Sequence, residues 1–294
     1  GSVREGETLH FGAGISVTIL ECGTFGHRRV RMCWKGDVAD AFAATGHIPL
    51  PPYIKRSDAE EDFNRYQTIY SREEKTGSVA APTAGLHFTD ELRETLRRRG
   101  FQWAEVTLYV GYGTFSPVRC EDIRNHQMHR EYVELPEETA NAIAEAKARH
   151  RPVIAVGTTS VRTLESLAAL AWRIRREGSP DEMRAVGQWE LYDIPASYTG
   201  REALEELLAY MERNDLGTLK ASTQIMITPL DYEFRIVHNI VTNFHQPKST
   251  LLLLVSAYVG EDWHRIYDYA LRNDFRFLSY GDSSLLVNDA PFAG

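Results

Sequence analysis

The sequence predicts an α/β protein: a three-layer α/β domain with a mixed or mostly parallel sheet, preceded by part of a small β-barrel. From about residue 55 onward, short apolar strand patterns alternate with amphipathic helix patterns, which is typical of layered α/β domains. Residues 1–50 instead show short alternating runs separated by glycines, a β pattern too short to close a barrel by itself. We therefore expect domains at 1–54 and 55–294, divided in the proline-dense segment 47–54.

The α/β domain contains elements whose ends are marked by capping residues, prolines and glycines. In order, they are a helix at 89–100, a strand at 103–110, a helix at 136–150, a strand at 152–156, a helix at 158–171, a strand at 235–244 and an apolar helix at 251–259. The polar stretch 173–219 shows no buried-strand pattern, so we expect a helical excursion from the main sheet.

Composition and charge exclude several classes of protein. The chain has 294 residues, enough for about two domains, and a formal net charge of −8, unlike the usual basic nucleic-acid-binding domain. The three cysteines have no C-x-x-C spacing, which disfavours a disulfide framework or zinc site and fits a reducing cytoplasm. No apolar stretch is long enough to cross a membrane, and no histidine pair has metal-ligand spacing, so we predict neither a membrane span nor a metal. Because the chain opens on Gly1-Ser2 without Met, we expect the natural N-terminus to lie upstream.

The first candidate site is the strand-to-helix junction containing Thr158, Thr159 and Ser160. Free N–H groups and the positive end of a helix dipole favour an anion there, whereas the alternative is ordinary N-capping. Arg162 and Glu165 in the next turns either belong to this site or form a surface pair.

The second candidate site is the junction 242–250, at the carboxyl end of a strand, where ligands bind in open α/β sheets. Its polar residues are Asn243, His245, Lys248, Ser249 and Thr250. A lysine at a helix start opposes the dipole and so favours an anionic partner, the alternative again being a cap with a solvated lysine.

Two further loops carry polar chemistry. The small-residue loop 81–88 contains Thr83 and Gly85 and ends in His87, which is either functional or a structural histidine. The Gly-rich segment 110–115 lacks the third glycine of a dinucleotide fingerprint and is followed by basic and imidazole side chains.

Together these stretches resemble one family, the S-adenosylmethionine:tRNA ribosyltransferase-isomerases of queuosine biosynthesis. The matching stretches follow the family's order across about residues 47–287, namely 65–68, 78–88, 113–119, 157–166, 242–260 and 277–282. Tyr109 and Gln246 stand where His and Leu are common in the family, so neither receives an invariant role. The family's N-terminal portion, with its Asn-Asp-Thr-Arg strand, has no counterpart here, and residues 3–52 correspond to the rest of its inserted β-barrel.

The resemblance implies transfer of the ribosyl moiety of S-adenosylmethionine to 7-aminomethyl-7-deazaguanine at the wobble position of a tRNA with a GUN anticodon. Epoxyqueuosine forms, while adenine and methionine leave. S-adenosylmethionine is then a co-substrate, no permanently bound cofactor is implied, and the full-length protein is expected to be a monomer. The sulfonium acidifies its neighbouring methylene, so one general base can start the reaction without a metal.

The resemblance also assigns roles to the candidate residues. His87, His245 and Lys248 are the catalytic candidates, with the two imidazoles suited to act as the base. The substrate-binding candidates are Thr83, Gly85, Gly113, Thr114, Thr158, Thr159, Ser160, Arg162, Asn243, Ser249, Thr250 and Asp282. The RNA-binding candidates are Arg97, Arg98, Arg99, Arg119, Arg124, His126, His129 and Arg130.

Two other functions compete with this interpretation. A non-catalytic module would bind a nucleoside or RNA without turnover, and a Ser/His hydrolase is disfavoured because no G-x-S-x-G motif occurs. Because part of the family's substrate crevice has no counterpart here, we expect this chain alone to be less active than a full-length protein. Unpaired strand edges lead us to expect residues 3–50 to be mobile or paired with another copy.

Overall fold

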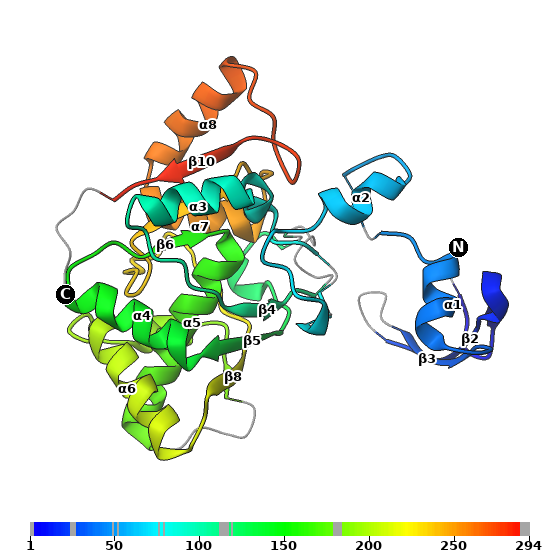
Figure 1. Ribbon diagram of the computed structural model, residues 1–294, viewed down its shortest axis with the longest axis horizontal. Coiled ribbons are helices and arrows are strands. Elements are labelled where there is room, and N and C mark those ends of the chain that lie inside the picture. The colour runs from blue at the N-terminus through cyan, green and yellow to red at the C-terminus, as the bar shows by residue number, and fades with distance from the viewer. Residues whose placement is uncertain are drawn as a thin grey trace. The chain divides into compact units, whose positions relative to one another are not determined.

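The computed structural model describes residues 3–23, 28–48, 50–51, 53–75, 77–78, 80–111, 118, 120–178 and 184–288 (Figure 1). The chain divides into two compact units, Gly1–Pro49 with Arg56–Asp58, and Leu50–Lys55 with Ala59–Gly294. The domain boundary expected at residue 54 stays a proposal, and the two units are described separately.

The first unit contains a three-stranded antiparallel sheet of β1 (Thr8–His10), β2 (Ser16–Cys22) and β3 (Arg28–Cys33) in that order. Within the described residues this sheet is open. Helix α1 (Val38–Thr45) follows β3 and was not expected from the β pattern of this region. It forms because Asp37 caps its first turn, accepting from Ala39 N at 2.8 Å, and because alanine favours helix.

The second unit confirms the α/β class, but its described strands form two short mixed sheets instead of one. One sheet has the order β10-β9-β6 and the other the order β4-β5-β8-β7. The pairs β6–β9 and β7–β8 are parallel, and the remaining pairs are antiparallel. The strands are β4 (Thr107–Tyr109), β5 (Glu131–Pro136), β6 (Ile154–Val156), β7 (Ala185–Val186), β8 (Thr218–Thr223), β9 (Asn239–Asn243) and β10 (Ser283–Leu286).

Several helices of this unit begin close to the expected positions. Thr89 caps α3 by accepting from Leu92 N at 3.1 Å, and Pro136 precedes α4. The helices are α2 (Glu60–Arg65), α3 (Asp90–Arg98), α4 (Glu137–Ala148), α5 (Thr158–Glu177), α6 (Gly200–Arg213), α7 (Thr250–Val259) and α8 (Asp262–Arg272), with short 3-10 turns η3 (Glu73–Lys75), η4 (Thr83–His87), η6 (Ile123–Asn125) and η7 (Glu190–Asp193). Among the described residues, no helix combines the length and apolar character needed to cross a membrane.

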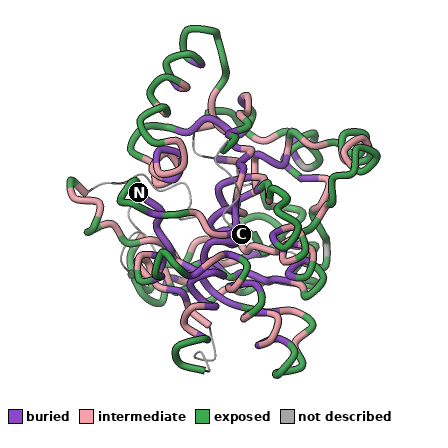
Figure 2. The backbone as a smooth tube through the Cα atoms, turned by 90° about the vertical axis from the view of Figure 1, so that its left-hand side faces the viewer, coloured by how far each residue is buried: buried purple, intermediate pink, exposed green. Residues whose placement is uncertain are grey.

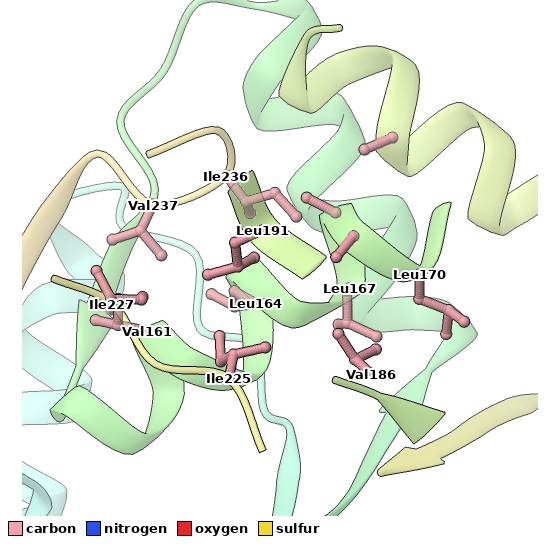
Figure 3. Packing of buried hydrophobic residues seen from close by; sticks show 14 of the residues in the cluster. Val161, Leu164, Leu167, Leu170, Val186, Leu191, Ile225, Ile227, Ile236 and Val237 are labelled. Atoms are coloured by element: carbon pink, nitrogen blue, oxygen red, sulfur yellow. The ribbon is translucent and has the colours of Figure 1, made fainter. Parts of the chain in front are cut away.

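Helix α5 forms the centre of the second unit and contacts strands of both sheets (Figure 1). Every residue from position 161 to position 171 is buried, as expected for a helix surrounded by other elements. Its leucines pack against Leu191, Ile225 and Ile236 (Figure 3), and Figure 2 shows such buried stretches in purple inside exposed green segments. This packing fixes the position of the helix N-terminus.

The stretch 173–219 differs from the expected helical excursion. Helix α5 continues into it, β7 pairs in parallel with β8, and α6 packs on α4 and α5. Leu204, Leu207 and Met211 are fully buried at i, i+3 and i+7, so α6 is an amphipathic core helix despite its many charges. The two-residue β7 is too short to produce a strand pattern.

Candidate functional site

The two predicted junctions lie next to each other. Strands β6 and β9 are parallel neighbours, with Val156 opposite Val241, and the Gly157 N–H donates to the Val241 carbonyl at 2.8 Å. The carboxyl ends of both strands are therefore at the same edge of the sheet. The junction at 157–160 continues from one strand and the junction at 242–250 from the other.

The loop ending in His87 reaches the same edge. A Cβ placed on Gly157 would lie 3.8 Å from the Ala84 Cβ, so η4 lies over the start of α5. At the end of η4 the exposed His87 has its Nε2 atom 3.1 Å from Asn243 Nδ2, the last residue of β9. Gly85 packs so closely on Tyr70 that a Cβ would come 1.9 Å from its hydroxyl, which explains a glycine at this position.

The start of α5 keeps the features of an anion site. Gly157, with φ 92°, is its N-cap, and none of the described side chains caps the first turn. Thr158 and Thr159 are buried, and the Ser160 hydroxyl donates back to the Val156 carbonyl at 2.8 Å. An anion at the first N–H groups of this helix stays a prediction, and the assigned side chains do not all face outward.

The interpretation of Arg162 and Glu165 as a surface pair is wrong, because both are buried and bind other partners. Arg162 Nη1 lies 3.0 Å from Glu131 Oε2, while its Nε and Nη2 atoms are buried and have no hydrogen-bond partner in the described part of the chain. Glu131 begins β5, more than thirty positions earlier in the chain, so sequence spacing gave no signal of this ion pair.

His245 is buried beneath the edge. Its Nε2 lies 2.9 Å from the Thr242 hydroxyl, and its backbone N–H donates to the Tyr267 hydroxyl at 3.0 Å. Burial lowers the pKa of His245 to about 4, and burial raises the pKa of Tyr267 to about 12. At neutral pH His245 is thus an uncharged imidazole inside the protein, a geometry that favours a structural role.

The candidate residues that follow His245 differ in exposure: Lys248 is exposed, whereas Ser249 and Thr250 are half-buried. Lys248 is exposed with φ 57°, and its carbonyl accepts from Val118 N at 3.1 Å, which brings the segment after the Gly-rich loop to this junction. Ser249 caps α7, accepting from Leu252 N at 3.2 Å and donating to the Gln246 carbonyl at 2.7 Å, so its hydroxyl is used inside the protein. Thr250 is half-buried in the first turn of α7.

Asp282 forms hydrogen bonds within its own loop. Asp282 Oδ2 accepts from Arg276 N at 2.6 Å, and the Asp282 N–H donates to the Arg276 carbonyl at 2.7 Å. The carboxylate assigned to substrate binding therefore braces the loop. The carbonyls of Leu278, Gly281 and Asp282 surround Asn243 Nδ2 at 3.1, 3.5 and 3.4 Å. Backbone acceptors of this kind leave no signature in the sequence.

The described basic candidates lie at the end of α3 and in the segment 124–130, which begins in η6. Arg97, Arg98 and Arg99 are exposed at the end of α3, a helix that begins three residues after His87. Arg124 donates two hydrogen bonds to the carboxylate of Asp122, whose charge offsets that of the guanidinium.

The remaining members of this group precede β5. His126 is half-buried, and burial followed by the neighbouring His129 lowers its pKa. His129 is half-buried and Arg130 is exposed. Gly113, Thr114 and Arg119 lie outside the described residues. Within the described part of the chain, no group of three or more His, Cys, Asp or Glu side chains could hold a metal ion.

Among known proteins, the family described as "Queuosine biosynthesis protein" matches residues 1–286 of this chain. The chain belongs to this family. It is 48% identical over 287 residues to the S-adenosylmethionine:tRNA ribosyltransferase-isomerase of Nitratidesulfovibrio vulgaris (strain DP4), covering 97% of this chain and 65% of the relative. The enzyme of the same name from Syntrophotalea carbinolica is 40% identical, with 97% of this chain and 71% of the relative covered. The resemblance inferred from the sequence is confirmed.

A solved structure is also similar. The crystal structure of S-adenosylmethionine tRNA ribosyltransferase from Thermotoga maritima is 26% identical, with a TM-score of 0.46, covering 97% of this chain and 66% of that chain. The queuosine family chain described here thus spans about 65% of the length of the first of these relatives.

Proposed function

We propose that this chain carries the catalytic part of a tRNA-modifying transferase-isomerase. The reaction moves the ribosyl moiety of S-adenosylmethionine onto 7-aminomethyl-7-deazaguanine at the wobble position of a tRNA with a GUN anticodon. Epoxyqueuosine forms, and adenine and methionine are released. The observation that carries this proposal is the meeting of His87, Asn243 and the uncapped start of α5 at one sheet edge, in a chain of the queuosine family.

The geometry supports a division of roles at this edge. The first N–H groups of α5 suit the carboxylate of the methionine moiety, because a helix N-terminus favours anions. The exposed ammonium of Lys248 suits a second anionic group, such as a tRNA phosphate. His87 is the imidazole exposed at the edge, whereas His245 lies buried below it.

The proposed substrates also define the setting. S-adenosylmethionine acts as a co-substrate, and the reaction as written needs no permanently bound cofactor. Because tRNA modification and S-adenosylmethionine belong to the cytoplasm, we place the protein there, as a monomer in its full-length form. The exposed Arg97 and Arg99 provide local positive charge for the RNA in a chain of net charge −8.

Adenine release tests the proposed activity directly. The chain is incubated with S-adenosylmethionine and an anticodon stem-loop that carries 7-aminomethyl-7-deazaguanine, and free adenine is measured by chromatography. We expect release that depends on both substrates and that is lost in His87→Ala. His264→Ala is the control and should keep the activity, since His264 is an exposed histidine elsewhere, on α8. Binding of both substrates without release by this chain, when the longer Nitratidesulfovibrio relative releases adenine under the same conditions, would favour the non-catalytic binding module.

Calorimetric titration with S-adenosylmethionine tests the placement of the methionine carboxylate. Ser160→Pro removes a first-turn N–H and should weaken binding about tenfold, whereas Ser160→Ala keeps the N–H and should bind as the parent does. Lys248→Glu, a second variant at this edge, should weaken binding of the stem-loop. Equal affinity for S-adenosylmethionine in the proline and alanine variants would place the carboxylate elsewhere.

A further inference from the structure

We infer that Asn243 fixes the tautomer of His87, so that His87 meets the substrate as a neutral Nδ1–H hydrogen-bond donor and not as the general base. Asn243 is then a positioning residue. The inference rests on the proposed function for the role of His87, but the tautomer itself is a property of the chain alone.

The orientation of the Asn243 amide is determined by three carbonyl groups. Its Nδ2 atom lies 3.1 Å from the Leu278 oxygen, 3.4 Å from the Asp282 oxygen and 3.5 Å from the Gly281 oxygen. Turning the amide by 180° would place Oδ1 against these three oxygens, which are all acceptors. The nitrogen must therefore face the carbonyl groups, and the side chain is 2% exposed, so water cannot reverse this preference.

The unpaired oxygen of the same amide points to the same conclusion. Oδ1 is buried and has no hydrogen-bond partner among the described residues, an arrangement that is energetically unfavourable. The amide keeps this orientation in spite of that cost, because one of its two N–H groups can donate to His87 and the other to the carbonyl groups. Buried polar atoms left unpaired are rare and often mark functional sites.

The loop that supplies the carbonyl groups has little freedom to move. Gly281 has no room for a side chain, since a Cβ would lie 2.3 Å from the Arg276 carbonyl. Asp282 bonds Arg276 through both its carboxylate and its N–H, and the Leu278 N–H donates to the Phe244 carbonyl at 3.0 Å. The loop therefore holds the amide in one orientation before any ligand binds.

The amide orientation decides the state of the imidazole. Asn243 Nδ2 can only donate, so His87 Nε2, 3.1 Å away, must accept and carries no proton. A neutral imidazole with a bare Nε2 has its proton on Nδ1. None of the described residues accepts a hydrogen bond from His87, and the side chain is exposed, so the Nδ1–H is available to a ligand.

This tautomer changes what His87 can do in the proposed reaction. A general base needs a free lone pair, and the lone pair of this ring is the one that Asn243 binds. A fixed N–H donor instead stabilises negative charge where it develops, as on the nitrogen of adenine when its glycosidic bond breaks. His87 then lowers the barrier to adenine departure without accepting the proton from the sulfonium-activated methylene.

Nitrogen NMR of the full chain labelled with ¹⁵N-histidine tests the tautomer. At neutral pH we expect the His87 ring to show a protonated Nδ1 and an unprotonated Nε2. Asn243→Asp places an acceptor beside Nε2 and should move the proton to that atom. Asn239→Asp makes the same change at the other end of β9, where Oδ1 accepts from Asn288 N, and should leave the His87 resonances unchanged. A protonated Nε2 in the parent chain would overturn the inference.

Substitution of His87 itself tests the role, and it does not depend on the folding of the Asn243 variant. In asparagine the amide nitrogen is attached to Cγ, as Nδ1 is in histidine, whereas glutamine places its amide nitrogen where Nε2 lies. If His87 acts as a donor through Nδ1, His87→Asn should release adenine at least about tenfold faster than His87→Ala and His87→Gln. Equally low rates for all three variants would restore His87 as the base. Failure of the parent chain to release adenine would count against the proposed function, while the NMR result would still decide the tautomer.

Discussion

Glu165 shows how a single buried charge can organise the neighbourhood of the site. Its Oε2 atom accepts from the Tyr232 hydroxyl at 2.6 Å and from Arg235 N at 2.9 Å. Its Oε1 atom accepts from Ile236 N at 3.1 Å and Val237 N at 2.8 Å. A buried carboxylate is tolerated when several donors satisfy it, and here the donors belong to the segment that leads into β9.

We predict that Glu165→Gln lowers the free energy of unfolding by about 3 kcal/mol, because the amide group would turn an N–H toward one of these donors. Urea denaturation measures the change. Glu205→Gln is the matched control, since Glu205 pairs with Arg201 on the exposed face of α6 and should change stability by less than about 0.5 kcal/mol. Similar losses in both variants would show that the four donors around Glu165 contribute little.

His245 gives the stability of the protein a defined pH dependence. Its pKa is about 4 in the folded chain because of burial, against an ordinary value of 6.5. The unfolded chain therefore binds a proton that the folded chain does not as the pH falls from 6.5 to 4, and stability falls in that window. The loss attributable to this residue should be about 3 kcal/mol, and it should be absent above pH 7.

This pH dependence is measured by urea denaturation of the parent chain and of His245→Asn at several values between pH 4 and pH 7. The variant removes the titrating group, so its stability should vary less steeply with pH in that window. Parallel curves for the two proteins would mean that His245 is not the group responsible.

At the scale of the element, the loop between α8 and β10 is held against the end of β9 by hydrogen bonds to Asn243. Gly281 is its tightest point, where a Cβ would meet the backbone of Arg276 and Phe277 at 2.3 and 2.5 Å. Backbone cannot move aside as a flexible side chain can. The family stretch 277–282 is therefore explained by packing and by the carbonyl groups that it presents to Asn243.

Gly281→Ala should destabilise the chain by about 1–3 kcal/mol through this overpacking and should also reduce adenine release, since the carbonyl groups around Asn243 shift. Gly217→Ala provides the control, because a Cβ there would meet no atom within 4 Å and the backbone is not in the left-handed region. Thermal denaturation and the adenine assay report the two effects. An alanine variant at 281 that matched the control in both measurements would contradict this account of the loop.

The elements that the sequence predicted are those with strong local signals. Thr89, Pro136 and Gly157 mark the starts of α3, α4 and α5, and α7 contains the apolar run from Leu251 to Val255. Strand β7 was not predicted because two residues carry no period, and α6 was not predicted as a core helix because its exposed charges dominate its composition.

The candidate site was predictable only in part. The parallel pairing of β6 and β9 put both junctions at one edge, as the rule for α/β sheets suggested. His87 and Asn243 are 156 positions apart, and the groups that orient Asn243 are backbone carbonyls. Neither their contact nor its consequence for the imidazole follows from spacing or composition.

On the scale of the whole molecule, charge presents the main problem for an RNA substrate. The net charge is −8, so the chain as a whole repels a polyanion at long range. Binding must then depend on a few exposed cations that are not offset by neighbouring carboxylates. Arg124 is offset by Asp122, whereas Arg97 and Arg99 are exposed at the end of α3, a helix about 13 Å long that begins after the turn carrying His87.

We therefore predict that the double variant Arg97→Glu and Arg99→Glu weakens binding of the anticodon stem-loop and flattens its salt dependence. Each lost phosphate contact lowers the slope of log affinity against log salt concentration by about 1, so the change should be about 2. Arg98 is left in place because it donates to Thr95 within the helix. The matched control reverses Arg151 and Arg176, which are exposed and lie before the opposite end of β6 and in the last turn of α5, respectively. Fluorescence anisotropy across a series of salt concentrations gives both slopes, and a larger change in the control would place the RNA surface on the other side of the sheet.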